Sequence, residues 1–212
     1  MKKIDISTWN RREHFAFFRK VDLPFYNVNT QVDITGLPEL AKSKSISLNS
    51  TLIFLTIQAM NQIDNFRYRI RDDEVVLHDA VHPSFTHLKK GEELFSIVTM
   101  DMDSDVIRFD RKLKQAVEES SGYFDFSKAA GRDDLVFMSS LPWISFTGLD
   151  HTLSLDRDDA IPRVSWGRYV NNGGQTMLPF NIRVNHVFVD GLHVGRFFEE
   201  FAKQLKRLSE SS

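Results

Sequence analysis

The sequence contains no cysteine among its 212 residues. Disulfide bonds, thiolate-bound metals and a cysteine nucleophile are therefore excluded. An excess of charge of one sign is also missing, because 27 Lys and Arg residues nearly balance 29 Asp and Glu residues. A chain without a basic excess has no general electrostatic attraction to nucleic acids or to anionic membranes.

Long apolar runs and linkers are missing as well. The longest apolar stretch, around Leu52–Ile57, is far too short to span a bilayer. Polar residues follow Lys2 and Lys3 where a secretory signal needs an apolar run. No Gly/Ser-rich or Pro-rich segment divides the chain, so residues 1–212 are expected to form one domain. These features predict a cytoplasmic enzyme or binding protein.

The chain does contain clear helix and strand patterns. Helices are predicted at Thr8–Lys20 (capped by Ser7 or Thr8), after Pro38, at Thr51–Asp64 (capped by Asn49 or Ser50), from Asp103 or Ser104 onward, and at His193–Leu208. Strands are predicted at Tyr26–Ile34, Arg67–Ile70, Val75–His78, Leu94–Met100, Leu135–Ser139, Trp143–Thr147, Arg163–Tyr169 and Thr176–Val189, with turns at Asp72-Asp73, Lys90-Gly91 and Asn171–Gly174 and a loop over 120–132. This order predicts an α/β fold, an α+β two-layer sandwich in which helices cover a mixed β-sheet.

The segment Leu178–Gly195 is the most informative for chemistry. Four apolar residues alternate along the predicted strand, namely Leu178, Phe180, Ile182 and Val184, while Asn181, Arg183 and Asn185 occupy the other face. His186 continues the apolar row and directly precedes Asp190-Gly191. This position predicts an imidazole that is partly desolvated and held in one direction.

Several interpretations of this segment stay open on the residues alone. His186 can be a core histidine whose hydrogen bonds are satisfied, with Asp190 capping the last helix. A metal site formed by His186, Asp190 and His193 has suitable ligand types, but the break from strand to turn to helix scatters their directions. The sequence has neither the G-x-S-x-G motif of a serine hydrolase nor a Gly-rich phosphate-binding loop.

Motifs along the whole chain resemble the chloramphenicol acetyltransferase family. Asn185-His186 through Asp190-Gly191 is similar to the H-H-x-x-x-D-G signature, which related acyltransferases also carry. Ser139–Trp143 resembles the S-A-x-P-W segment, and Trp9–Phe15 resembles the opening W-x-R-R-E-H-F segment. Further similarities follow in the same order, at Val32–Thr35, Gln58–Gln62 and Arg71–Glu74.

The resemblance implies a role for each matched residue. It makes His186 the general base, Ser139 the hydrogen-bond donor to the oxyanion, and Ser165 a helper that acts through a bound water. It pairs Asp190 with Arg11, an ion pair that fixes the turn carrying His186. It assigns coenzyme A contacts to Trp143, Arg168 and Tyr169, and acceptor contacts to Phe17, Phe18, Tyr26, Phe95, Phe126, Leu149 and His151. It also implies a homotrimer with active sites between subunits, acetyl-CoA as co-substrate, and no metal.

Three departures from the family pattern matter. Asn185 replaces the first histidine of the signature, and we expect the base to survive because alternate strand residues face opposite ways. His151 and Leu149 replace an apolar and an aromatic residue, and Ile97 replaces a small one. A polar His151 and a bulkier Ile97 would reshape an apolar pocket and favour another acceptor.

These observations give a preferred function and two alternatives. The preferred one is an acetyl-CoA-dependent O-acetyltransferase that acetylates the hydroxyl of chloramphenicol by direct transfer in a ternary complex. The imidazole suits this chemistry, because an ordinary pKa near ~6.5 leaves it mostly neutral at pH 7 and able to take a proton. The alternatives are the same catalyst acting on a different small acceptor, and a non-catalytic binding protein on this fold.

Overall fold

The computed structural model describes residues 1–152 and 156–210. Within them, the helices are α1 (Arg12–Phe18), α2 (Leu37–Ser43), α3 (Leu48–Asn61), the 3₁₀ turn η1 (Asp64–Phe66), α4 (Val106–Glu119) and α5 (Gly191–Glu210). The strands are β1 (Lys2–Ile4), β2 (Phe25–Asp33), β3 (Tyr68–Arg71), β4 (Glu74–Leu77), β5 (His82–His87), β6 (Ser96–Thr99), β7 (Leu135–Leu141), β8 (Arg163–Gly167), β9 (Val170–Asn172) and β10 (Gln175–Asn185). No helix in the described part is long and apolar enough to cross a membrane.

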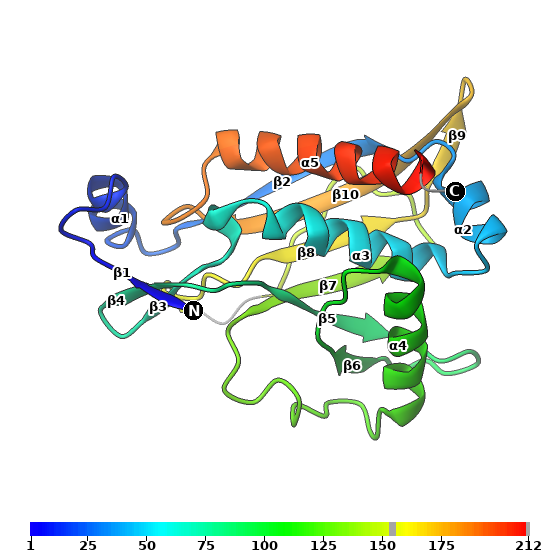
Figure 1. Ribbon diagram of the computed structural model, residues 1–212, viewed down its shortest axis with the longest axis horizontal. Coiled ribbons are helices and arrows are strands. Elements are labelled where there is room, and N and C mark those ends of the chain that lie inside the picture. The colour runs from blue at the N-terminus through cyan, green and yellow to red at the C-terminus, as the bar shows by residue number, and fades with distance from the viewer. Residues whose placement is uncertain (153–155, 211–212) are drawn as a thin grey trace.

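A mixed seven-stranded sheet organises the molecule. Its strands run in the order β2-β10-β8-β7-β5-β6, and β9 pairs with β10 as well. Strand β10 is antiparallel to both β2 and β8, whereas β7 is parallel to β8 and β5. A second sheet of three strands, β1-β4-β3, lies beside α1 at one end of the molecule (Figure 1). The predicted fold class, a mixed sheet covered by helices, is confirmed.

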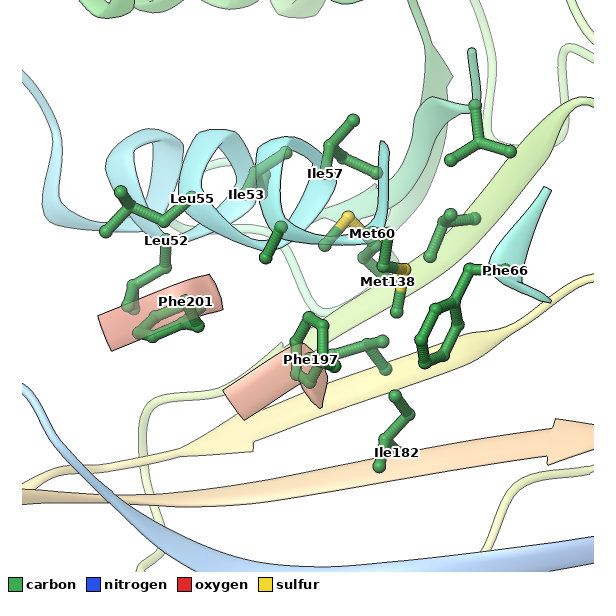
Figure 2. Packing of buried hydrophobic residues seen from close by; sticks show 14 of the residues in the cluster. Leu52, Ile53, Leu55, Ile57, Met60, Phe66, Met138, Ile182, Phe197 and Phe201 are labelled. Carbon is green, nitrogen blue, oxygen red and sulfur yellow. The ribbon is translucent and has the colours of Figure 1, made fainter. Parts of the chain in front are cut away.

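The core lies between the large sheet and a layer of helices in which α3 packs between α5 and α4 (Figure 1). Ten of the fourteen residues of α3 are buried, which is why its apolar residues surround the helix instead of following one stripe. Figure 2 shows Leu52 of α3 directed toward Phe201 of α5. Because this layer holds β10 and α5 rigidly, it also positions the turn between them.

Helix boundaries differ from the predictions where local side chains offer a better cap. Helix α1 starts at Arg12 instead of Thr8, because turns with backbone bonds such as Thr8 N–H to Asp5 O precede it. Helix α3 is capped by Ser47, whose hydroxyl accepts from Ser50 N–H. Helix α4 is capped by Asp105, whose carboxylate accepts from Arg108 N–H.

Two predicted strands are wrong in part or entirely. Trp143–Thr147 is not a strand: β7 ends at Leu141, and a turn follows in which Ile144 N–H donates to Leu141 O. The predicted strand Thr176–Val189 ends at Asn185, because the Asn185 carbonyl accepts from both Phe188 and Val189 N–H and so turns the chain. The turn at Gly173-Gly174 is confirmed, and both glycines have positive φ.

Candidate active site

The Arg11 guanidinium holds the turn between β10 and α5. Arg11 precedes α1 and is 9% exposed. Its Nη1 and Nη2 donate to the two carboxylate oxygens of Asp190 at 2.5 and 2.6 Å. Its Nε donates to Val187 O at 2.8 Å, and Nη2 also donates to His186 O at 3.0 Å. This bidentate pair with two further carbonyls is the ion pair expected from the sequence, and it fixes residues 186–190 as a unit.

The imidazole of His186 projects from this turn into an aromatic setting. Its ring stacks on Phe18 with centroids 4.0 Å apart and lies 4.9 Å from the ring of Tyr26. Nδ1 is buried without a hydrogen-bond partner and lies 3.1 Å from Asp190 Oδ1, outside hydrogen-bond alignment. The side chain is 36% exposed, and its Nε2 is the ring nitrogen left accessible. His186 is therefore an imidazole held in one orientation, with one ring nitrogen available.

Charges around the turn are set by burial and by Arg11. Hydrogen bonds from Arg11 hold the pKa of the Asp190 carboxyl below its usual range, so the carboxylate stays ionised. Burial raises the pKa of Tyr26 to about 12, and its hydroxyl donates to Val189 O at 3.3 Å. Burial lowers the pKa of His193, whose Nδ1 accepts from Asp190 N–H. The site therefore combines one carboxylate and one guanidinium with a neutral tyrosine.

The metal interpretation finds no support in this geometry. Both carboxylate oxygens of Asp190 bind Arg11, and His193 Nδ1 already accepts a backbone hydrogen bond. Across residues 1–152 and 156–210, no group of three or more His, Asp or Glu side chains is arranged to hold a metal ion. Asp190 also does not cap α5 with its side chain; its backbone carbonyl accepts from His193 and Val194 N–H instead.

Ser139 lies in a different part of the chain from His186. Its hydroxyl lies 3.1 Å from the Thr86 hydroxyl, and both residues line a cavity of about 660 Å³ between β5, β7 and the β5–β6 turn. Trp143 and Phe95 line the same cavity. Of the residues predicted to contact acetyl-CoA or its oxyanion, this cavity brings Ser139 and Trp143 together.

The strand register gives the separation between Ser139 and His186. Ser139 pairs with Ser165, which pairs with Asn181 on β10. Asn181 precedes His186 by five positions, roughly 17 Å at the rise of an extended strand. One carbonyl oxygen cannot contact both groups within a single chain. Ser165 itself is buried between its two strand partners.

The predicted acceptor aromatics fall into separate groups. Phe18 and Tyr26 contact His186, and Phe17 is exposed with its ring perpendicular to that of Phe18. Phe126 lines a second, apolar cavity of about 360 Å³ together with Ile97, Met138 and Thr86. Phe95 is exposed and contacts Phe124, which in turn stacks with Phe126. Thr86 lines both cavities, so the two are neighbours.

His151 and Leu149 form a polar network on the sheet. His151 Nε2 lies 2.7 Å from Asn181 Oδ1, and Asn181 Nδ2 donates to Leu149 O. Asn29 accepts from Leu149 N–H and from Asn181 Nδ2. Burial lowers the pKa of His151, so it is neutral near pH 7.

The remaining predicted coenzyme residues lie near Trp143. Arg168 N–H donates to Ile144 O at 2.7 Å, which joins the end of β8 to the loop that carries Trp143. Trp143, Arg168 and Tyr169 are all exposed, Trp143 at 63%. Of the three, Trp143 lines the Ser139 cavity.

Sequence reasoning missed two supporting residues. Asn185 donates to Arg157 O and Asp159 O and accepts from Val187 N–H, so it ties the loop before β8 to the turn of His186. Its place directly before His186 was the available signal. Thr86, the partner of Ser139, carried no signal, because only the parallel pairing of β5 with β7 brings them together.

Comparison with solved structures places this fold among CoA-dependent acyltransferases. A chloramphenicol acetyltransferase superposes with a TM-score of 0.89 at 25% identity and covers 96% of this chain and all of that one. A probable dihydrolipoamide acetyltransferase from Listeria monocytogenes has a TM-score of 0.61 at 14% identity, covering 98% of this chain and 95% of that one, a likeness of fold alone.

Sequence comparison narrows the class. The family model described as chloramphenicol acetyltransferase matches residues 1–202. The chain is 32% identical over 200 residues to a chloramphenicol acetyltransferase of Klebsiella sp, covering 93% of this chain and 90% of the relative. It is 30% identical to chloramphenicol acetyltransferase 3 of Escherichia coli over 92% of each chain. The protein belongs to the chloramphenicol acetyltransferase family, and it is an acyltransferase.

Proposed function

We propose that the chain is one acyltransferase domain that moves the acetyl group of acetyl-CoA to the hydroxyl of chloramphenicol. The family and the names of its relatives support this acceptor. The observation that carries the mechanism is the His186 ring, stacked on Phe18 and anchored by the Arg11–Asp190 pair, with Nε2 accessible.

The environment of His186 favours one protonation pattern. Its buried Nδ1 faces the Asp190 carboxylate at 3.1 Å, so a proton on Nδ1 is electrostatically favoured there. Nε2 then keeps its lone pair and accepts the proton of the acceptor hydroxyl. The hydroxyl oxygen attacks the thioester carbonyl, and the tetrahedral intermediate collapses with loss of the CoA thiolate. The imidazolium returns the proton to that sulfur, so the base is restored.

A second copy of the chain completes the site in this proposal. Ser139 donates to the oxyanion of the intermediate, with Ser165 assisting through a bound water. Because Ser139 lies two strands away from β10 and level with Asn181, which is itself roughly 17 Å of strand before His186, the donor belongs to the neighbouring protomer. This separation supports active sites between subunits, and the resemblance to the family supports a homotrimer, in which Trp143, Arg168 and Tyr169 bind CoA. Phe17, Phe18, Tyr26, Phe95, Phe126 and Leu149 surround the acceptor.

A different small acceptor is the second candidate, and His151 favours it. His151 adds a neutral, half-buried imidazole to the predicted acceptor set, and Ile97 occupies space beside Phe126. A polar group in an apolar pocket selects ligands that hydrogen-bond to it. His151→Leu should then lower KM for chloramphenicol, whereas no change would remove the basis for this candidate.

One assay tests the proposed function. CoA release from acetyl-CoA is followed by thiol detection, with and without chloramphenicol, for the wild type and for His186→Ala. Release that requires both chloramphenicol and His186 supports the proposal. Release with another alcohol alone would transfer the mechanism to a different acceptor, and no release with any acceptor would refute it. Size-exclusion chromatography with light scattering gives the number of protomers, and a monomer would contradict an active site shared between subunits.

A further inference from the structure

The turn between β5 and β6 places two unpaired lysines at the rim of the Ser139 cavity. Lys89 and Lys90 are exposed, and both line that cavity. Glu92 N–H donates to Lys89 O, and Gly91 has a φ of +87°, so the turn has a defined backbone. Across the part of the chain that the structure describes, neither ammonium group has an ion-pair partner.

We propose that Lys89 and Lys90 bind the phosphate groups of coenzyme A, an inference that rests on the proposed use of acetyl-CoA. The cavity has Ser139, the proposed oxyanion donor, on its wall and the two lysines at its rim, as CoA has its thioester at one end and its phosphates at the other. Ser139 bonds Thr86 on its wall, and Lys90 lies four residues after Thr86, at most about 13 Å away along the chain. The pantetheine arm of CoA spans such a length between its thioester and its phosphates.

Other charged groups on this rim decide how strong the effect is. Glu92 and Glu93 line the same cavity, so the turn has no net charge. The lysines attract phosphate because they lie close to it, and the two glutamates weaken that attraction. Burial lowers the pKa of His87, and the charge of Lys89 lowers it further, whereas Glu92 raises it. His87 and Lys89 both line the cavity, so the Lys89 ammonium is close to groups on its wall.

Calorimetric binding to the full-length protein tests the proposal without requiring turnover. Lys89→Gln/Lys90→Gln is expected to raise the Kd for CoA about tenfold, since two exposed charge pairs contribute at most about 1 kcal/mol each. Binding of pantetheine, which has the same arm without phosphates, should not change. Glu92→Gln/Glu93→Gln should tighten CoA binding. Lys2→Gln/Lys42→Gln, which removes two exposed lysines outside this cavity, is the matched control and should behave as wild type.

The outcomes separate this inference from the proposed function. Equal loss of affinity for CoA and pantetheine, or wild-type CoA affinity in the double variant, would overturn the role of the lysines. In the second case, an enzyme that still acetylates chloramphenicol keeps its proposed function. If the double variant binds CoA more weakly but the wild-type enzyme does not acetylate chloramphenicol, the proposed role of the lysines is supported and only the proposed acceptor is wrong. A wild-type protein that binds no CoA would overturn both.

Discussion

Replacing Arg11 by Ala is the sharpest test of how the His186 turn is held. The change removes four hydrogen bonds, two to the Asp190 carboxylate and two to the carbonyls of His186 and Val187. Breaking one side of a buried ion pair costs about 3–5 kcal/mol. The Asp190 side chain is 30% exposed and can be rehydrated, so we expect about 3 kcal/mol, near the lower end. For a chain of this size that corresponds to a Tm lower by roughly 6–12 °C.

Arg12→Ala is the matched control for this measurement. Arg12 is the next residue, but it is exposed and bonds only Ser7 O at 3.1 Å, with Glu13 4.0 Å away. Its loss should change the free energy of unfolding by less than about 0.5 kcal/mol. Both variants are compared by thermal unfolding at one protomer concentration, because the stability of an oligomer depends on concentration. Equal Tm values for the two variants would refute the reasoning.

The same pair predicts a dependence on pH. Arg11 lowers the folded-state pKa of Asp190, so the pair stabilises the protein fully above the unfolded carboxyl pKa of about 3.9. That contribution is lost as pH falls through the lowered folded pKa. The difference in unfolding free energy between wild type and Arg11→Ala should therefore be constant near neutrality and shrink in acid. A difference that grows on acidification would show that the charge of Asp190 is not involved.

Three further substitutions test the proposed chemistry. His186→Ala should lower kcat by at least ~10²–10⁴ with unchanged CoA binding by calorimetry, since only the base is removed; wild-type turnover would disprove the assignment. Ser139→Ala should lower kcat by roughly 10²–10³ with little change in KM, because the oxyanion forms only in the transition state; a raised KM at constant kcat would make Ser139 a binding residue. Tyr26→Phe should keep kcat within a few-fold in steady-state assays, because its ring still contacts His186 and only the 3.3 Å bond to Val189 O is lost; a larger loss would give the hydroxyl a role in catalysis.

The sequence predicted elements whose pattern is local and missed boundaries that tertiary contacts decide. Helix α4 and the glycine turn before β10 follow from an apolar stripe and from a glycine pair, and both occur, although the cap of α4 is Asp105 and not Asp103 or Ser104. The run Val187-Phe188-Val189 reads as a strand because it is apolar, yet it is a buried turn held by Asn185 and Arg11. Strand β1 was not predicted, because three residues at a sheet edge are too few to show an alternating apolar pattern.

For the candidate site, the sequence predicted which types of residue take part. It did not predict the distances between their side chains. The pairing of Arg11 with Asp190 came from the family motif, and the structure contains it. The stack of Phe18 on His186 depends on how α1 approaches β10, which no periodicity encodes. The separation of Ser139 from His186 depends on strand order, since β8 lies between β7 and β10.

The pairing of β2 with β10 has a consequence for how the chain folds. Strand β2 ends at Asp33, and its register partner in β10 is Met177, so the first strand of the large sheet has its ladder only after most of the chain exists. Contacts of such sequence separation slow folding, because the loop between them must close first. During synthesis on a ribosome, β2 and Arg11 therefore lack their native partners until β10 and Asp190 emerge. Nascent chains halted before Leu178 should remain protease-sensitive, and release of the following segment should make them resistant in one step.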